Sequence, residues 1–195
     1  MPLLFATAPY VVRDLTRHEL PAVQALFEAN PSYFIKAGGL PPRPDEAERQ
    51  FEELPPPHLT FSERWFAGVF DDRGGLRGLL IVTSDLSAPG VWHIALFFLD
   101  DRARGTGIAI RLHAALEAWA HARGAQWLRL AVISGNAAAE RFWDKVGYTE
   151  VRTRPYVNAG GNQVTARILI RPLAGSAIED YLRLVPRDAP DSPLP

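Results

Sequence analysis

Hydrophobic positions divide the chain into segments with two different spacings. A continuous apolar run, Val91 to Leu99, is typical of a buried strand and ends at a charged turn. From Ile108 onward apolar residues recur at helical intervals, as far as Gly124, which suits the end of a helix. The pattern therefore predicts a strand, a glycine-containing turn and a long helix in immediate succession.

The remaining pattern predicts a mixed α/β arrangement. Strands are expected at 10–15, 65–70, 76–84, 127–133, 148–154 and 164–171, and helices at 16–30, 45–54 and 137–146. The segment 31–44 mixes aromatic residues with glycines and prolines, which predicts an irregular loop. Residues 1–172 are expected to form one domain. Residues 173–195 are expected to form a C-terminal extension, partly disordered, with one helical turn at 178–184.

Composition narrows the class of protein. Of 195 residues 47% are hydrophobic and the net charge is −1, so the chain can bury a core and has no overall charge that attracts nucleic acid or an anionic membrane. Cysteine is absent, which excludes disulfides, thiolate metal sites and a cysteine nucleophile. No apolar run approaches the roughly 20 residues of a membrane span. The start has no basic leader of the kind found in signal peptides, and we expect a cytoplasmic protein.

The turn before the long helix is the strongest candidate for a binding site. Its residues are Arg102, Ala103, Arg104, Gly105, Thr106 and Gly107. The first N–H groups of a helix have no partner within it and carry the positive end of its dipole. Glycines have no Cβ, so an anion can approach their backbone closely. The turn therefore predicts a phosphate or diphosphate site. The dinucleotide motif Gly-x-Gly-x-x-Gly fails at Ile110, and the Gly-Lys-Ser/Thr of a P-loop is missing.

Two motifs resemble the GNAT superfamily of acyl-CoA-dependent N-acyltransferases. Arg102-x-x-Gly105-x-Gly107, after an apolar strand, is similar to the family's diphosphate-binding motif. Asn136-x-x-Ala139-x-x-x-Trp143-x-Lys145-x-Gly147-Tyr148 is similar to its second motif, Asn-x-x-Ala-x-x-x-Tyr-x-Lys-x-Gly-Phe. The flanking elements agree with the family's fold from Tyr10 to Arg171. The resemblance implies one α/β domain with a mixed, mostly antiparallel sheet, a V-shaped splay between the central strands and helices on both faces.

The resemblance also implies how acetyl-CoA, the co-substrate, would bind. Backbone N–H groups from Ala103 to Ile108 would hold the diphosphate, with Arg102 and Arg104 beside it. The strand end Leu96, Phe97 and Phe98 would pair through its main chain with the pantetheine arm. The backbone N–H of Phe97 would stabilise the oxyanion of the tetrahedral intermediate. Asn136 would contact the pantetheine or adenine side, although an asparagine after a strand can equally be a turn residue.

Two residues are candidates for proton transfer. His93 could take the proton of an ammonium acceptor, because imidazole titrates near neutral pH and strict alternation places His93 on the face of Phe97. A satisfied core histidine is the alternative. Trp143 stands where the family usually has a tyrosine that protonates the leaving thiolate, which an indole N–H cannot do. The thiolate would leave unassisted, or a tyrosine at 33, 148 or 156 would serve, or the protein would bind acyl-CoA without turnover.

Acceptor specificity is expected in the segments 31–44 and 156–163, where Tyr33, Phe34 and Tyr156 would contact the substrate. His113, Glu117 and His121 have metal-capable spacing, but their helical face lies opposite the apolar stripe, so we expect it to be solvated and to hold no metal.

These observations predict an N-acetyltransferase that moves an acetyl group to a primary amine of a small molecule by direct attack in a ternary complex. Neither nucleic acid nor a membrane is an expected partner, and family habit allows a homodimer. One alternative is a non-catalytic module that binds or senses acyl-CoA. Another is an acetyltransferase for protein N-termini or lysines.

Overall fold

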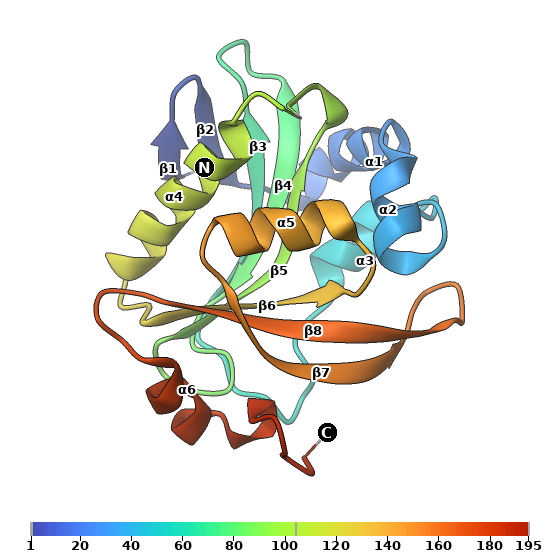
Figure 1. Ribbon diagram of the computed structural model, residues 1–195. Coiled ribbons are helices and arrows are strands. Elements are labelled where there is room, and N and C mark those ends of the chain that lie inside the picture. The colour runs from blue at the N-terminus through green and yellow to red at the C-terminus, as the bar shows by residue number, and fades with distance from the viewer. Residues whose placement is uncertain (1, 104, 195) are drawn as a thin grey trace.

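The computed structural model describes residues 2–103 and 105–194, and their centre is an eight-stranded sheet (Figure 1). The strands are β1 (Leu3–Thr7), β2 (Tyr10–Asp14), β3 (Arg64–Phe70), β4 (Leu76–Thr83), β5 (Val91–Leu99), β6 (Trp127–Ile133), β7 (Thr149–Val157) and β8 (Gln163–Pro172). Their order in the sheet is β1-β2-β3-β4-β5-β6-β8-β7. Neighbours are antiparallel except β5 and β6, which are parallel. The predicted mixed, mostly antiparallel sheet is confirmed.

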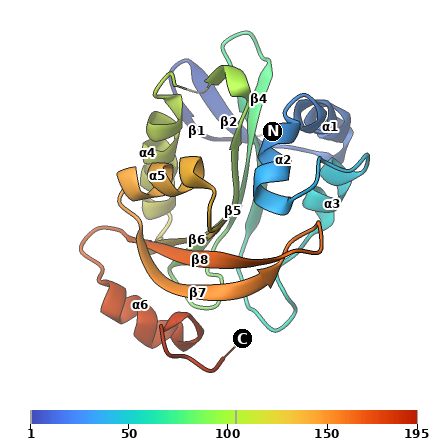
Figure 2. The same ribbon diagram turned by 45° about the vertical axis from the view of Figure 1, so that its right-hand side comes forward.

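Helices cover both faces of the sheet (Figure 2). On one face lie α1 (Leu20–Glu28), α2 (Pro31–Gly38) and α3 (Glu46–Glu52), and on the other lie α4 (Ile108–His121) and α5 (Ala137–Lys145). Short 3₁₀ turns, η1 (Arg17–Glu19), η2 (Asp101–Ala103) and η3 (Pro186–Asp188), and a last helix, α6 (Ile178–Leu184), complete the described elements. In the part of the chain that the structure describes, no helix is both long and apolar enough to cross a bilayer.

The segment expected to be a loop contains α2, so that prediction was wrong. Pro31 begins the helix, where its fixed φ is favourable, and Gly39 ends it at φ +81°. Tyr33 packs edge-on against Phe98 with ring centroids 4.9 Å apart, and Phe34 packs on Phe27 at 4.8 Å. The aromatic residues therefore anchor a short helix that begins at a proline and is capped by a glycine.

One extra residue interrupts the register of β5. Opposite β4, Leu96 pairs with Ile81 and Ile94 pairs with Val82, so Ala95 has no opposite residue. This is a β-bulge, which bends the strand and reverses the alternation of side chains beyond it.

The bulge changes which residues of β5 share a face. Trp92 and Ile94 belong to the core beneath α4, whereas Leu96 and Phe98 belong to the core beneath α1. His93 therefore lies on the face of Leu96, and Phe97 packs on the opposite face. The expectation that His93 and Phe97 share a face was wrong, because strict alternation does not hold across a bulge.

The central strands separate soon after they meet. β5 and β6 pair at Val91 with Trp127, at Trp92 with Leu128 and at His93 with Arg129, and the described residues show no pairing beyond this point. The predicted V-shaped splay is confirmed.

The C-terminal extension, expected to be partly disordered, contributes α6 and η3. Tyr181 and Asp188 are fully buried there. The indole N–H of Trp127 donates to the carbonyl oxygen of Ala177 at 2.9 Å. The extension is therefore packed against the base of the sheet.

Candidate active site

A cleft opens where β5 and β6 separate. It encloses about 190 Å³ between β5, β6, α2 and α5. Its lining residues are Tyr33, Ala37, Ile94, Ala95, Phe97, Leu130, Ala131, Val132, Ile133, Asn136, Ala139 and Trp143. Ala95 and Ala131 are exposed although they lie in the middle of central strands, positions that a closed sheet buries. The splay therefore leaves room for an extended ligand between the strands.

The glycine turn has the features of an anion site. Gly105 and Gly107 have φ of +73° and +76°, and a Cβ added to either would meet no atom within 4 Å. Gly107 is the N-cap of α4 and provides no side chain to cap it, so helical geometry leaves the N–H groups of Ala109 and Ile110 without intrahelical acceptors. Open space and free donors coincide here, which fits a diphosphate.

The turn is held in place by polar contacts that the sequence did not reveal. A carboxylate oxygen of Asp100 accepts from the N–H of Ala103 at 3.2 Å, and the hydroxyl of Thr106 donates to the carbonyl of Ala103 at 2.7 Å. The side-chain oxygen of buried Asn30 accepts from the N–H of Asp101 at 3.0 Å and joins the turn to the end of α1. The donors are therefore preorganised.

Of the two arginines predicted beside the diphosphate, Arg102 is exposed on η2, and Arg104 lies outside the described residues. Asn136 is the N-cap of α5, where its side-chain oxygen accepts from the N–H of Ala139 at 3.4 Å, and it also lines the cleft. It is therefore both a turn residue and a cleft residue.

Three tyrosines were candidates to replace the tyrosine missing at Trp143. Trp143 is 8% exposed and lines the cleft. Tyr148 is buried with its hydroxyl 3.1 Å from Nε2 of His113, and it does not line the cleft. Tyr156 is 52% exposed and does not line the cleft. Tyr33 does line the cleft, and burial raises its pKa, so its hydroxyl keeps its proton.

His113 was expected on a solvated face, and this was wrong. It is 2% exposed and packs among Phe97, Trp143 and Tyr148. Burial lowers its pKa to about 4, so the imidazole is neutral. In the described residues no group of three acidic, histidine or cysteine side chains could hold a metal ion.

A second cavity, of about 280 Å³, lies on the His93 face of β5. We name it the acceptor cavity after the role that we propose for it under Proposed function. Its lining residues are Gln50, Glu53, Leu54, Pro55, Pro56, Leu59, Arg64, Ile81, Thr83, Leu86, Ser87, His93, Ala95, Arg129 and Arg187. Ala95 is the residue that lines both the cleft and the acceptor cavity. The two spaces thus lie on either side of β5 and share Ala95, the residue at the bulge, as part of their walls.

His93 is held by Arg129 at the edge of the acceptor cavity. Nη1 of Arg129 lies 3.2 Å from Nδ1 of His93. A guanidinium can only donate, so Nδ1 accepts and the imidazole proton is on Nε2. Burial, with the charge of Arg129, lowers the pKa of His93 to about 3. This neutral imidazole has its lone pair engaged and is a poor base, which argues against the base role predicted for it.

A comparison with protein families agrees with this geometry. The family model described as "Acetyltransferase (GNAT) family" matches residues 23–148, which is more than half of the chain. The protein belongs to the GNAT acetyltransferase family.

Solved structures of GNAT proteins share this fold. A GCN5-related N-acetyltransferase from Kribbella flavida has a TM-score of 0.61 and 22% identity, covering 85% of this chain and 98% of that chain. An acetyltransferase from Thermus thermophilus has a TM-score of 0.62 and 22% identity, and the match covers 84% of this chain and 97% of that chain. The ribosomal-protein-S18-alanine N-acetyltransferase from Escherichia coli has a TM-score of 0.61 and 18% identity, and the match covers 86% of this chain and 96% of that chain. A comparison with curated protein sequences finds no match.

The structure brings together four of the site residues that were singled out in the sequence. Phe97, Asn136, Trp143 and Tyr33 line one cleft. Phe34 instead packs in the core against Phe27 and Phe98. Sequence reasoning missed Arg129, Arg187 and Glu53 of the acceptor cavity, because they come from three distant segments and form no local motif.

Proposed function

We propose that the protein is an acetyl-CoA-dependent N-acetyltransferase that acts on a primary amine of a small molecule. The observation that carries this proposal is that two cavities on either side of β5 share Ala95 as a lining residue. The cleft with its glycine turn suits the donor, and the acceptor cavity suits the amine. Donor and acceptor would then approach each other at one position of β5.

The donor site consists largely of main chain. Gly105, Gly107 and the first turn of α4 hold the diphosphate. Beyond His93, β5 has no partner on its β6 side within the described residues, so its main-chain groups are available to an extended arm. The N–H of Phe97 is the proposed donor to the thioester oxygen. Acetyl-CoA supplies an acetyl group activated as a thioester.

In the reaction the acceptor amine must lose a proton and the leaving thiolate must gain one. Arginines in the acceptor cavity favour the neutral form of a bound amine, because like charges lower the pKa of an ammonium group. This reduces the need for a base. The hydroxyl of Tyr33, which shares the cleft with Trp143, is proposed to donate a hydrogen bond to the leaving thiolate, while the proton lost by the attacking amine ends on the thiol. Direct attack is favoured because the chain has no cysteine to carry the acetyl group.

The volume of the acceptor cavity supports a small acceptor. Its walls are α3, the segment 54–59 and η3, and its 280 Å³ lies near the lower end of the range for small-molecule sites. Acetylation of a protein N-terminus, as the name of the Escherichia coli neighbour states for that protein, would instead need an open groove for the peptide.

Calorimetry with coenzyme A, followed by thiol release from acetyl-CoA with a panel of amines, tests the proposal. We expect binding and amine-dependent thiol release. Binding without thiol release for any amine would favour the sensing module. Turnover confined to peptides would favour a protein acetyltransferase, and no binding would refute the assignment.

A further inference from the structure

The acceptor cavity is lined by more positive than negative charge. Arg64 of β3, Arg129 of β6 and Arg187 of η3 line it, and Glu53 is the single carboxylate among its described lining residues. Behind the cavity wall, Asp188 pairs with both Arg129 and Arg154. Arg129 is already counted as a lining residue, so the charges of Asp188 and Arg154 cancel each other. An amine with no acidic group would meet a repulsive field here.

Two of the three arginines already have partners. The guanidinium of Arg64 donates to the carbonyl oxygens of Gln50 at 2.5 Å and Phe51 at 3.2 Å, at the end of α3. Arg129 donates to Asp188 from Nε at 2.7 Å and from Nη2 at 3.3 Å, and its remaining Nη1 faces His93. These residues shape the cavity but have few donors left for a ligand.

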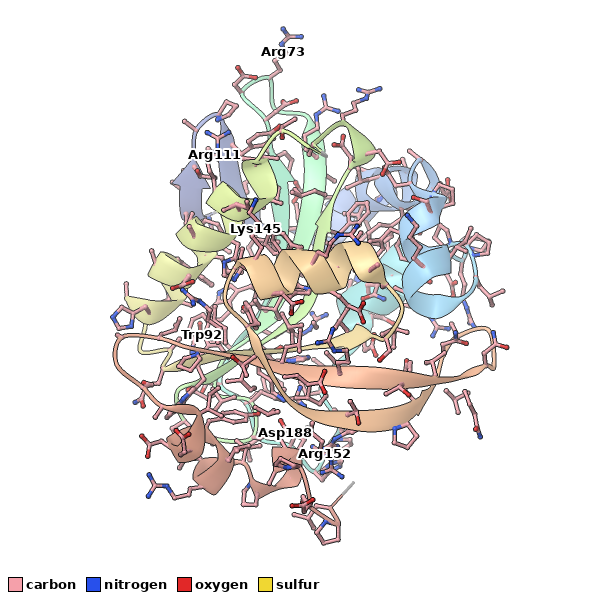
Figure 3. All side chains as sticks on the ribbon, viewed as in Figure 1. Arg73, Trp92, Arg111, Lys145, Arg152 and Asp188 are labelled. Carbon is pink, nitrogen blue, oxygen red and sulfur yellow. The ribbon has the colours of Figure 1, made fainter. Side chains whose placement is uncertain are left out.

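Arg187 differs from both. Its backbone carbonyl accepts from the guanidinium groups of Arg152 and Arg154, which fixes η3 against β7. Figure 3 labels Arg152 of β7 and, in the same region, Asp188 of η3. Its own guanidinium has no ion pair or hydrogen bond to any described residue, and its Nε is shielded from solvent without a partner. Leaving a shielded donor unpaired is costly, so an anionic ligand would supply the acceptor that the Nε–H of Arg187 lacks among the described residues.

Apolar side chains cover another part of the acceptor cavity. They are Leu54, Pro55, Pro56, Leu59, Ile81 and Leu86. A ligand that fills the cavity therefore needs an apolar portion as well as an anionic group.

Resting on the proposed function, we propose that the acceptor is an amino acid with an apolar side chain, whose carboxylate binds the guanidinium of Arg187. The carboxylate neutralises the excess positive charge that would repel a simple alkylammonium. A guanidinium binds a carboxylate through two parallel N–H donors, which also fixes orientation. The amine would then point toward Ala95, the residue that lines both the acceptor cavity and the cleft. The C-terminal extension thus contributes a specificity residue.

Matched acceptors test this charge requirement. Leucine and 3-methylbutylamine, and phenylalanine and phenethylamine, differ only by the carboxylate, and thiol release measures turnover of each. We expect kcat/KM to be about 10- to 100-fold higher for the amino acid of each pair. Equal or faster turnover of the decarboxylated amines overturns the inference and leaves the acetyltransferase assignment intact. Loss of coenzyme A binding would refute that assignment instead.

Variants locate the carboxylate. Arg187→Gln is expected to raise KM for the amino acids about 10- to 100-fold and to lower KM for the decarboxylated amines, because one repelling charge is removed. Arg183→Gln is the matched control, because Arg183 is exposed on α6 and pairs with Asp180. Calorimetry with 3-phenylpropionate, which has no amine, gives a readout independent of turnover. Binding by the parent chain and by Arg183→Gln, but not by Arg187→Gln, supports the site. Equal binding by both variants overturns it.

Discussion

Arg129 donates a hydrogen bond to His93 at the last paired position of β5 and β6, with 3.2 Å between Nη1 and Nδ1. The same guanidinium is bound by Asp188, which lies 59 residues further along the chain and outside the matched segment 23–148. The protonation state of an imidazole in the acceptor cavity therefore depends on the C-terminal extension.

Replacement of His93 by glutamine is expected to leave the acidic limb of the kcat profile unchanged. With a pKa of about 3, the imidazole is already neutral throughout the range of about pH 6 to 9 in which such profiles are measured. Thiol release at saturating substrates measures the profile. Disappearance of a limb in His93→Gln would show that His93 acts as the base after all.

Acid is expected to destabilise the fold through His113. Its pKa is 6.5 in the unfolded chain and about 4 in the folded protein. Between these values the unfolded chain binds a proton that the folded protein does not, so the free energy of unfolding falls as the pH is lowered through this window. In His113→Gln this fall should be shallower by up to about 1.4 kcal/mol per pH unit. Urea unfolding at several pH values measures it, and His18→Gln, at an exposed position, should keep the parent slope.

A tryptophan at Gly107 is expected to weaken coenzyme A binding at least about 100-fold, because it fills the space where the diphosphate approaches. Gly124→Trp is a matched control. Gly124 also has a positive φ, of +94°, and open space around a Cβ, but it lies at the opposite end of α4. Both variants should carry a similar backbone strain of about 1–2 kcal/mol. Calorimetry compares them, and equal affinities would remove the glycine turn from the site.

Removal of the Tyr33 hydroxyl is expected to lower kcat about 100-fold while KM for acetyl-CoA stays constant, because the hydroxyl acts on the leaving group. Tyr156→Phe, at an exposed position, should have no effect. Trp143→Tyr, made in the Tyr33→Phe background, should restore part of the rate if a tyrosine at 143 can donate a hydrogen bond to the thiolate. An unchanged kcat in Tyr33→Phe would mean that the thiolate leaves unassisted.

Asp188→Asn is expected to lower the free energy of unfolding by about 3–5 kcal/mol, because it removes the charge of the buried carboxylate that pairs with two half-buried guanidinium groups. Burial opposes ionisation of Asp188, but hydrogen bonds and charge from Arg129, Tyr181 and Arg154 lower its pKa. Urea unfolding measures the loss. Asp180→Asn, which breaks an exposed pair with Arg183, should change stability by less than about 1 kcal/mol.

The sequence predicted elements well where periodicity is strong and unbroken. The bounds of β5 and β6 were predicted correctly, and the long helix begins at Ile108 as expected. β1 was missed, because a five-residue apolar start gives little pattern. α2 was missed because its proline start and glycine end are also the signals of a loop.

The site was predictable only where it is local. The glycine turn and Asn136 belong to contiguous motifs, and both lie where the motifs indicate. The face of His93 depends on a bulge at Ala95, which depends on pairing with β4 and has no signal in β5 alone. The charges of the acceptor cavity come from Glu53, just after α3, and from β3, β6 and η3, so only the folded chain brings them together.

The bulge at Ala95 also has an evolutionary consequence. Because it lies between two cavities on opposite faces of β5, the residues that line the acceptor cavity, Ala95 apart, are not those that line the cleft. Under the proposed function, substitutions in α3 or η3 could change the acceptor amine without changing the residues that bind coenzyme A. Strand β5 thus separates the two cavities, and Ala95 is the residue that lines both of them.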